Sequence, residues 1–180
     1  MSKAFTREDD GNEDDAPLPA YVPPWPAGGR NYISAAGHAR LRAEHEALVA
    51  SLPMLTSAAR AAAPVDAPTC KAALREARRR LQQLDVHLEV AEIVPFVAAP
   101  TRVQLGATVT VRGDREAVYT IVGVDEVDVA HGRISWLSPL ARALTGARVG
   151  DLVTFRSKKG EEELEIVTIG GPAANPSVQD

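Results

Sequence analysis

Two segments of this chain carry leucine and alanine at an alternating spacing of four and three residues, and this pattern constrains the fold most strongly. In the first segment the spaced positions are Leu41, His45, Leu48, Leu52, Leu55, Ala59 and Ala62. In the second they are Leu74, Ala77, Leu81, Leu84, Leu88 and Ala91. Such a spacing places one apolar seam along one side of a helix. We therefore predict two helices, over residues 34–62 and 69–94.

The segment RAAAPVDAPTCK (60–71) joins the two predicted helices, and Pro64 and Pro68 bracket its turn. Two helices joined by a short loop can bury facing seams only by folding back on each other. We therefore predict an antiparallel helical hairpin, a short coiled coil, over residues 30–95. Each arm is roughly 40 Å long at a rise of about 1.5 Å per residue. Pro53 should kink the first arm or break one turn, and Pro95 should end the second.

The rest of the chain has the pattern of a small antiparallel sheet. Segments rich in alternating or β-branched residues occur at 107–113, 117–126, 133–138, 151–157 and 163–169. Between them, SPLARALTG (138–146) has Ser138 at an N-cap position, Pro139 at the first helical position and Gly146 after the end. The predicted fold class is thus α+β: the hairpin, followed by a C-terminal domain over 96–180 with one short helix against the sheet.

Residues 1–29 combine acids with prolines, as disordered segments do. They hold two bases and six acids, which are Glu8, Asp9, Asp10, Glu13, Asp14 and Asp15. This segment therefore accounts for the whole net charge of −4, since eighteen acids balance eighteen bases elsewhere. We predict a disordered leader whose deletion leaves thermal stability nearly unchanged. The alternative is that Tyr21 and Trp25 dock on a surface or a partner.

The sequence offers no site at which this chain alone would act as an enzyme. Its four histidines and single cysteine, Cys70, form no pattern typical of metal ligands, and no phosphate-binding glycine loop or nucleophile elbow is present. His45 falls on the seam and is interpreted as a polar seam residue. No apolar run approaches the ~20 residues that span a bilayer. We expect a cytoplasmic monomer that needs no cofactor, metal or membrane.

The order of these segments resembles the GreA/GreB family of bacterial transcript-cleavage factors. The similar segments are YTIVGVDE (119–126), RISWLSPLARALTG (133–146), VGDLVTF (149–155), NYISAAGHARLRAEHEAL (31–48) and ALREARRRLQQLDVHLEVAEIV (73–94). The resemblance covers about residues 31–170. It implies an FKBP-like C-terminal domain, a role in the regulation of transcription elongation, and bacterial RNA polymerase as the partner. It also implies that the protein belongs to the broad class of DNA-binding proteins.

In that family the C-terminal domain docks on the rim of the polymerase secondary channel, and the hairpin extends towards the active centre. The rim contact carries over to Ser138 and Pro139. An acidic or amide residue often precedes this pair in the family, but Leu137 occupies the position here. Helix capping alone is the alternative role for Ser138 and Pro139.

The hairpin tip departs from the family pattern. Cleavage-competent relatives carry an Asp and a Glu that help hold a second Mg²⁺ in the polymerase, and the equivalent positions here fall at or near Arg60 and Ala63. Asp66 is the one carboxylate left in the tip, and its alternative role is a helix cap or turn former. Residues 57–80 hold six bases and two acids, a net charge of +4. Arg75, Arg78 and Arg79 could contact RNA or phosphates, or form a solvated helix face.

From these features we expect a polymerase-binding regulator with weak or no stimulation of transcript cleavage, in which Mg²⁺ is held only through the polymerase. Three alternatives stay open. The first is a factor that still stimulates cleavage through Asp66. The second is a protein like the shorter-hairpin relatives named nucleoside diphosphate kinase regulators. The third is a peptide-binding module built on the FKBP-type fold, although no ring of aromatics is available to line such a pocket.

Overall fold

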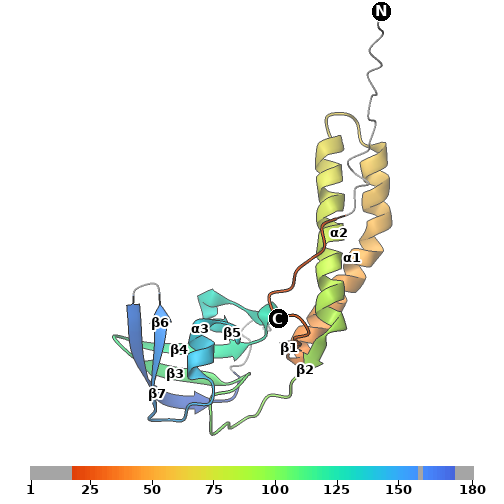
Figure 1. The fold of residues 1–180 in the computed structure, drawn as a ribbon. Coiled ribbons are helices and arrows are strands. Elements are labelled where there is room, and N and C mark those ends of the chain that lie inside the picture. The colour runs from red at the N-terminus through yellow and green to blue at the C-terminus, as the bar shows by residue number, and fades with distance from the viewer. Residues whose placement is uncertain (1–17, 158–159, 173–180) are drawn as a thin grey trace, which may run out of the picture.

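A computed structural model describes residues 18–157 and 160–172, and it consists of a long helical hairpin attached at its base to a sheet domain (Figure 1). The hairpin contains α1 (Ala35–Ala61) and α2 (Ala67–Glu89). The sheet domain contains β3 to β7 and the short helix α3 (Pro139–Leu144). The predicted order of a helical hairpin followed by a small sheet with one short helix is therefore confirmed.

The two long helices pack along the predicted seams. Leu41 of α1 and Leu84 of α2 are 2% and 1% exposed and form a buried cluster with Ile33 at the base of the hairpin. Farther out, the seam residues Leu48, Leu52, Leu55 and Leu74 are only half-buried, since two helices alone have no further layer to cover them. Pro53 was predicted to kink the first arm or to break one turn. It lies inside α1, which continues to Ala61, so the helix is not broken there. Among the described residues, no helix is both long and apolar enough to cross a membrane.

The second arm ends earlier than predicted. α2 stops at Glu89 instead of residue 94, and Ala91–Ile93 forms strand β2. β2 pairs in parallel with β1 (Asn31–Ile33), so the two ends of the hairpin are tied together by backbone hydrogen bonds. The β-branched residues at 90, 93 and 94 favour this extended pairing over another helical turn.

The C-terminal sheet has five strands in the order β5-β4-β3-β7-β6. They are β3 (Thr108–Arg112), β4 (Glu116–Val122), β5 (Arg133–Ser135), β6 (Leu152–Ser157) and β7 (Gly160–Gly170). The sheet was predicted to be antiparallel, and this is correct for every pairing except β4 with β5, which is parallel. The connection between β4 and β5 contains two short 3₁₀ turns, Val124–Glu126 and Val129–His131. After these turns, β5 runs in the same direction as β4.

The main core lies between one face of the sheet and α3. Val109, Val111, Ile121 and Ile166 of the sheet are at most 1% exposed, as are Ala141 and Leu144 of α3. α3 begins as predicted, because the Ser138 hydroxyl accepts a hydrogen bond from the Ala141 amide at 3.1 Å and Pro139 occupies the first turn. The small helix thus closes the sheet domain.

Part of the predicted leader is not a free tail. Residues 1–17 lie outside the described residues, but residues 18–29 run along the hairpin (Figure 1). Trp25 is 6% exposed, and its ring lies 4.7 Å from that of His87 on α2 in an edge-on arrangement. The Tyr21 hydroxyl also lies 2.7 Å from His87 Nε2. The docking alternative therefore holds for residues 18–29, because two large rings in a proline-rich segment gain enough from burial to fix it. We call residues 18–29 the strap.

Replacing Trp25 by alanine should lower the free energy of unfolding by about 3 kcal/mol, because a buried ring is lost and a cavity remains. Urea unfolding followed by circular dichroism measures this change. Val22→Ala, in the same strap but at a side chain that is 82% exposed, is the matched control and should be nearly neutral. Equal stability of the Trp25 variant and the native chain would show that the strap contributes nothing to folding.

Candidate functional site

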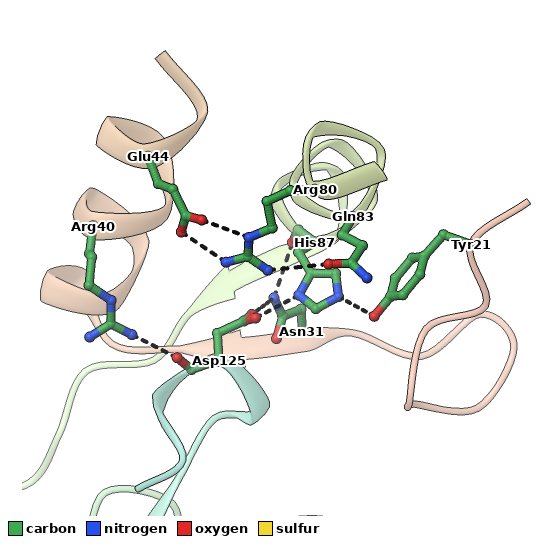
Figure 2. A network of polar contacts seen from close by, with 8 residues as sticks. All are labelled: Tyr21, Asn31, Arg40, Glu44, Arg80, Gln83, His87 and Asp125. Carbon is green, nitrogen blue, oxygen red and sulfur yellow. Dashed lines mark hydrogen bonds and ion pairs between the residues drawn. The ribbon is translucent and has the colours of Figure 1, made fainter. Parts of the chain in front are cut away.

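A buried histidine, His87, joins three parts of the molecule at the base of the hairpin (Figure 2). Its Nδ1 lies 2.7 Å from Asp125 Oδ1, which belongs to the turn after β4. Its Nε2 lies 2.7 Å from the Tyr21 hydroxyl of the strap. Asn31 of β1 donates from Nδ2 both to Asp125 Oδ2 at 2.7 Å and to the His87 carbonyl at 3.2 Å. His87 makes both of its side-chain contacts if it donates from Nδ1 to Asp125 and accepts at Nε2 from Tyr21. Among the described residues, the buried Oδ1 of Asn31 has no hydrogen-bond partner.

The charge state of this network follows from its surroundings. Burial would raise the pKa of Asp125, but hydrogen bonds from His87 and Asn31 outweigh burial and hold that pKa below its usual value. Burial, with the nearby charge of Asp125, raises the pKa of Tyr21, so the phenol keeps its proton. Asp125 is therefore an anion at neutral pH. Its partners come from α2 and β1 of the hairpin, whereas the carboxylate itself belongs to the sheet domain.

A second carboxylate of the same turn binds the start of α1. Glu126 is 6% exposed, its Oε2 accepts from the Ser34 amide at 2.9 Å, and its Oε1 accepts from the Ser34 hydroxyl. The Ser34 hydroxyl in turn accepts from the Gly37 amide at 2.9 Å, which caps α1. An anion near a helix N-terminus is stabilised by the helix dipole. A side chain at Gly37 would collide with Glu126, since a Cβ atom there would lie 2.8 Å from Glu126 Cδ.

These contacts form the joint between hairpin and sheet domain, which we define as Asn31, Ser34, His87, Asp125 and Glu126. The ring of Tyr32 adds an edge-on contact with Trp136 at 5.2 Å. Around the joint, Arg40 of α1 donates to the Asp125 carbonyl at 2.7 Å. The joint thus uses two adjacent acids of one turn to position both helices.

Farther along the hairpin, ion pairs link its two arms. Arg80 of α2 donates two hydrogen bonds to Glu44 of α1, at 2.6 and 2.8 Å. This bidentate contact lowers the pKa of Glu44. His45 of the seam lies 2.9 Å from Asp85 across the arms, which agrees with its interpretation as a polar seam residue. Beyond Glu46, the sequence of α1 contains no further acid.

At the hairpin tip, Asp66 occupies the N-cap position of α2, but its carboxylate makes no capping hydrogen bond. Its backbone closes the turn instead, with its amide donating to the Ala63 carbonyl at 2.9 Å. The neighbouring Val65 is 82% exposed. Arg60 is also exposed and lies in the last turn of α1. The tip therefore presents one carboxylate and no second acid beside it.

The three arginines singled out from the sequence lie on α2 but differ in their contacts. Arg75 and Arg79 are exposed, and Arg78 is half-buried. Arg79 is within 3.4 Å of Glu76. Because residues 75 and 78 are three positions apart, their side chains lie on the same side of α2.

At the other end of the molecule, Ser138 and Pro139 lie at the start of α3. Ser138 caps the helix, so the capping role is present whatever else the residue does. Pro139 is exposed, and its neighbour Leu137 is half-buried. These residues and the tip are at opposite ends of the structure, and the fold does not bring them into one site (Figure 1).

The described residues hold no group of three or more His, Cys, Asp or Glu side chains able to bind a metal ion. Sequence analysis missed the joint, and in particular His87, Asp125 and Asn31. Only the acidic pair at 125–126, at the end of the segment YTIVGVDE, was a visible signal. Their partners lie 38 to 94 residues away in sequence, so no local pattern could reveal the contact.

Replacing Asp125 by asparagine should lower the free energy of unfolding at neutral pH by about 2 kcal/mol, because buried donors lose a charged acceptor. Since the folded-state pKa of Asp125 is lowered, its contribution is present above the ordinary value of 3.8 and is lost as the pH falls below it. The variant should therefore show a flatter loss of stability between neutral and acidic pH, measured by urea unfolding at each pH.

Asp114→Asn is the control, because Asp114 is an exposed acid of the same domain, in the turn between β3 and β4. This control should keep the native pH dependence. Parallel pH profiles for Asp125→Asn and the native chain would contradict the role given to Asp125.

Comparison with known proteins agrees with this architecture. The family model described as "Transcription elongation factor, GreA/GreB, C-term" matches residues 98–170. Transcription elongation factor GreB of Pseudomonas aeruginosa is 38% identical over 165 residues, which cover 86% of this chain and 98% of that protein. GreB of Neisseria meningitidis serogroup A is 46% identical over 103 residues, covering 55% of this chain and 63% of the relative's length.

Among solved structures, the GreA factor homolog 1 (Gfh1) of Thermus thermophilus is 24% identical, with a TM-score of 0.38 over 79% of this chain and 100% of its own. The identity to the Pseudomonas protein extends along nearly its whole length, and so includes both the hairpin and the sheet domain. The chain therefore belongs to the GreA/GreB family of transcription elongation factors.

Proposed function

We propose that this protein binds bacterial RNA polymerase through its C-terminal domain and places its hairpin in the secondary channel, with little or no stimulation of transcript cleavage. Family membership and the length of the hairpin support the first part. α1 and α2 contain 27 and 23 residues, so the hairpin is about 35 Å long. The joint should hold the hairpin in a fixed direction relative to the C-terminal domain, because Asp125 and Glu126 together bind both of its arms.

The composition of the tip supports the second part. A second Mg²⁺ in a polymerase active centre needs several oxygen ligands, and paired acids supply them in cleavage-competent relatives. Here the corresponding positions fall at or near Arg60 and Ala63, and Asp66 is the one carboxylate left in the tip. The nearby bases raise the local potential and oppose cation binding. This single-carboxylate tip is the observation that carries the proposal.

The long hairpin favours a channel-binding regulator over a shorter-hairpin protein of the nucleoside diphosphate kinase regulator type. Two alternatives can be distinguished in a reconstituted system that contains purified polymerase and a backtracked elongation complex. A protein of the nucleoside diphosphate kinase regulator type would not bind polymerase. A cleavage-stimulating factor would shorten the RNA by a reaction that depends on Asp66.

Replacing Pro139 by lysine should weaken binding to core RNA polymerase at least about tenfold, since a long charged side chain would enter the docking surface. This position is preferable to Ser138, because loss of the serine cap would cost about 1 kcal/mol of stability by itself. Binding is measured by fluorescence anisotropy of the labelled protein. Val118→Lys, at a residue of β4 that is 55% exposed, is the control and should bind as the native chain does. Unchanged binding of the Pro139 variant would contradict the docking site.

The native chain should leave backtracked RNA uncleaved at ordinary Mg²⁺, and it should slow cleavage by an active family member as its own concentration rises. Asp66→Ala should compete as well as the native chain, because docking and hairpin length decide occupancy. Pro139→Lys should compete poorly. Gel analysis of the end-labelled RNA measures all three.

The double substitution Arg60→Asp and Ala63→Glu tests the tip directly, since it adds the missing acids and should give measurable cleavage if the hairpin reaches the active centre. Strong cleavage by the native chain that disappears in Asp66→Ala would overturn the proposal and make Asp66 a metal ligand.

A further inference from the structure

The face of the sheet that carries the core is longer than the helix that covers it. α3 has six residues and is about 9 Å long, whereas β7 has 11 residues and is about 36 Å long. Part of this face therefore stays uncovered, and at the end near the β3–β4 turn it forms an open groove of about 740 Å³. None of the residues that line the groove belongs to α3, so the groove is separate from the proposed docking position at Pro139.

The floor of the groove is apolar and includes two aromatic rings. Val111 of β3 pairs with Ala117 of β4, and Tyr119 lies two positions after Ala117, so all three side chains share one face of the sheet. Phe155 and Leu164 line the groove from β6 and β7. Leu164 is 8% exposed, whereas Tyr119 and Phe155 are only half-buried. The groove thus leaves part of both rings uncovered.

One carboxylate, that of Glu162, shares the face of the two rings. Glu162 pairs with Phe155 across β6 and β7, and directly paired residues project to the same face. Glu162 is half-buried, and no hydrogen bond or ion pair joins its side chain to another described residue. The Tyr119 hydroxyl also makes no hydrogen bond to a described residue. A partly shielded carboxylate of this kind gains from a cation that enters the groove.

The rim of the groove is acidic. Asp114, Glu161 and Glu163 line it and are exposed, and Arg115 is the one base among the described residues of the lining. Together with Glu162, the lining therefore holds four acids and one base, a net charge of −3. A concave surface with apolar walls and charge of one sign attracts ligands of the opposite charge. The groove fits a cation that also has a planar or apolar part.

We propose that this groove binds an arginine side chain from an extended segment of a partner protein. A guanidinium group is planar and always charged, so it can stack on Tyr119 or Phe155 and donate two hydrogen bonds to Glu162. A lysine side chain fits less well, because its ammonium group is compact and strongly hydrated. The groove has the volume of a pocket for a ligand larger than one side chain, so residues on either side of the arginine also enter it.

The test uses the full-length, isotope-enriched protein and the peptide acetyl-Gly-Ser-Arg-Ser-Gly-amide. In an NMR titration the amide signals of the residues that line the groove should shift and saturate, with a dissociation constant of about 1 mM or below. The same peptide with citrulline in place of arginine is the matched control, because citrulline keeps the shape of the side chain without its charge. It should bind at least about tenfold more weakly. The lysine peptide should bind about threefold more weakly than the arginine peptide.

Two substitutions in β7 identify the carboxylate. Glu162→Gln keeps the size of the side chain and removes its charge, so it should weaken binding of the arginine peptide about tenfold. The fold should be unaffected, because the Glu162 side chain bonds to no described residue. Glu165→Gln is the matched control, since Glu165 lies on the opposite face of the same strand and contacts Arg112 at 3.3 Å. This variant should bind the peptide as the native chain does.

Four outcomes would contradict the proposal. Equal binding of the arginine and citrulline peptides would show that charge does not select the ligand, and unchanged binding by Glu162→Gln would remove that residue from the site. Shifts confined to the hairpin or the joint would place the ligand elsewhere. Shifts of the groove signals when the protein alone is diluted would assign the groove to a second copy of this chain. Polymerase is absent from these titrations, so their result is independent of the docking test with Pro139→Lys.

Discussion

The buried contact of Asp125 and Glu126 with the base of the hairpin is the interaction on which the rest of the structure depends. A two-helix hairpin has one seam and no second layer, so its direction in space must be fixed at one end. The two acids do this by binding different arms: Asp125 contacts His87 of α2, and Glu126 contacts Ser34 at the start of α1. Removing a partner from either contact would be costly, because it would leave an unpaired carboxylate in a place shielded from water.

The same arrangement explains why burial decreases along the hairpin. At the base, the parallel strands β1 and β2, the strap and the sheet domain cover the helices, and Ile33, Leu41 and Leu84 are almost fully buried. Towards the tip the seam is covered only by the opposite helix, and Val49, Met54 and Val65 are exposed. A hairpin of this kind is stabilised at its base and exposes much of its far half.

The strap shows how a segment with the composition of a tail can become part of a fold. Its prolines exclude a helix, and its composition alone favours disorder. Tyr21 and Trp25 nevertheless meet the one buried histidine of α2, which supplies a hydrogen-bond acceptor and an aromatic surface. Sequence could show that these two rings were able to dock, but the partner was visible only after α2 and the turn after β4 had been brought together.

The sequence by itself determined the elements that depend on local periodicity and capping. The spacing of leucines placed both long helices, Ser138 and Pro139 marked the start of α3, and the alternation of β-branched residues located the strands. That Asp66 is the one acid of the tip is also a property of the sequence, because it concerns only which residue stands at each position.

Only the tertiary structure decided what depends on distant pairing. The end of the predicted second helix forms strand β2 instead, because Asn31–Ile33 provides a strand with which its backbone pairs. Likewise, β5 pairs in parallel with β4 because of the path of the intervening turns. The joint required Asn31, His87 and Asp125 to meet although they are far apart in the chain. Local patterns reflect the preferences of neighbouring residues, whereas a buried hydrogen-bond network arises only when the fold removes water from groups that the sequence keeps apart.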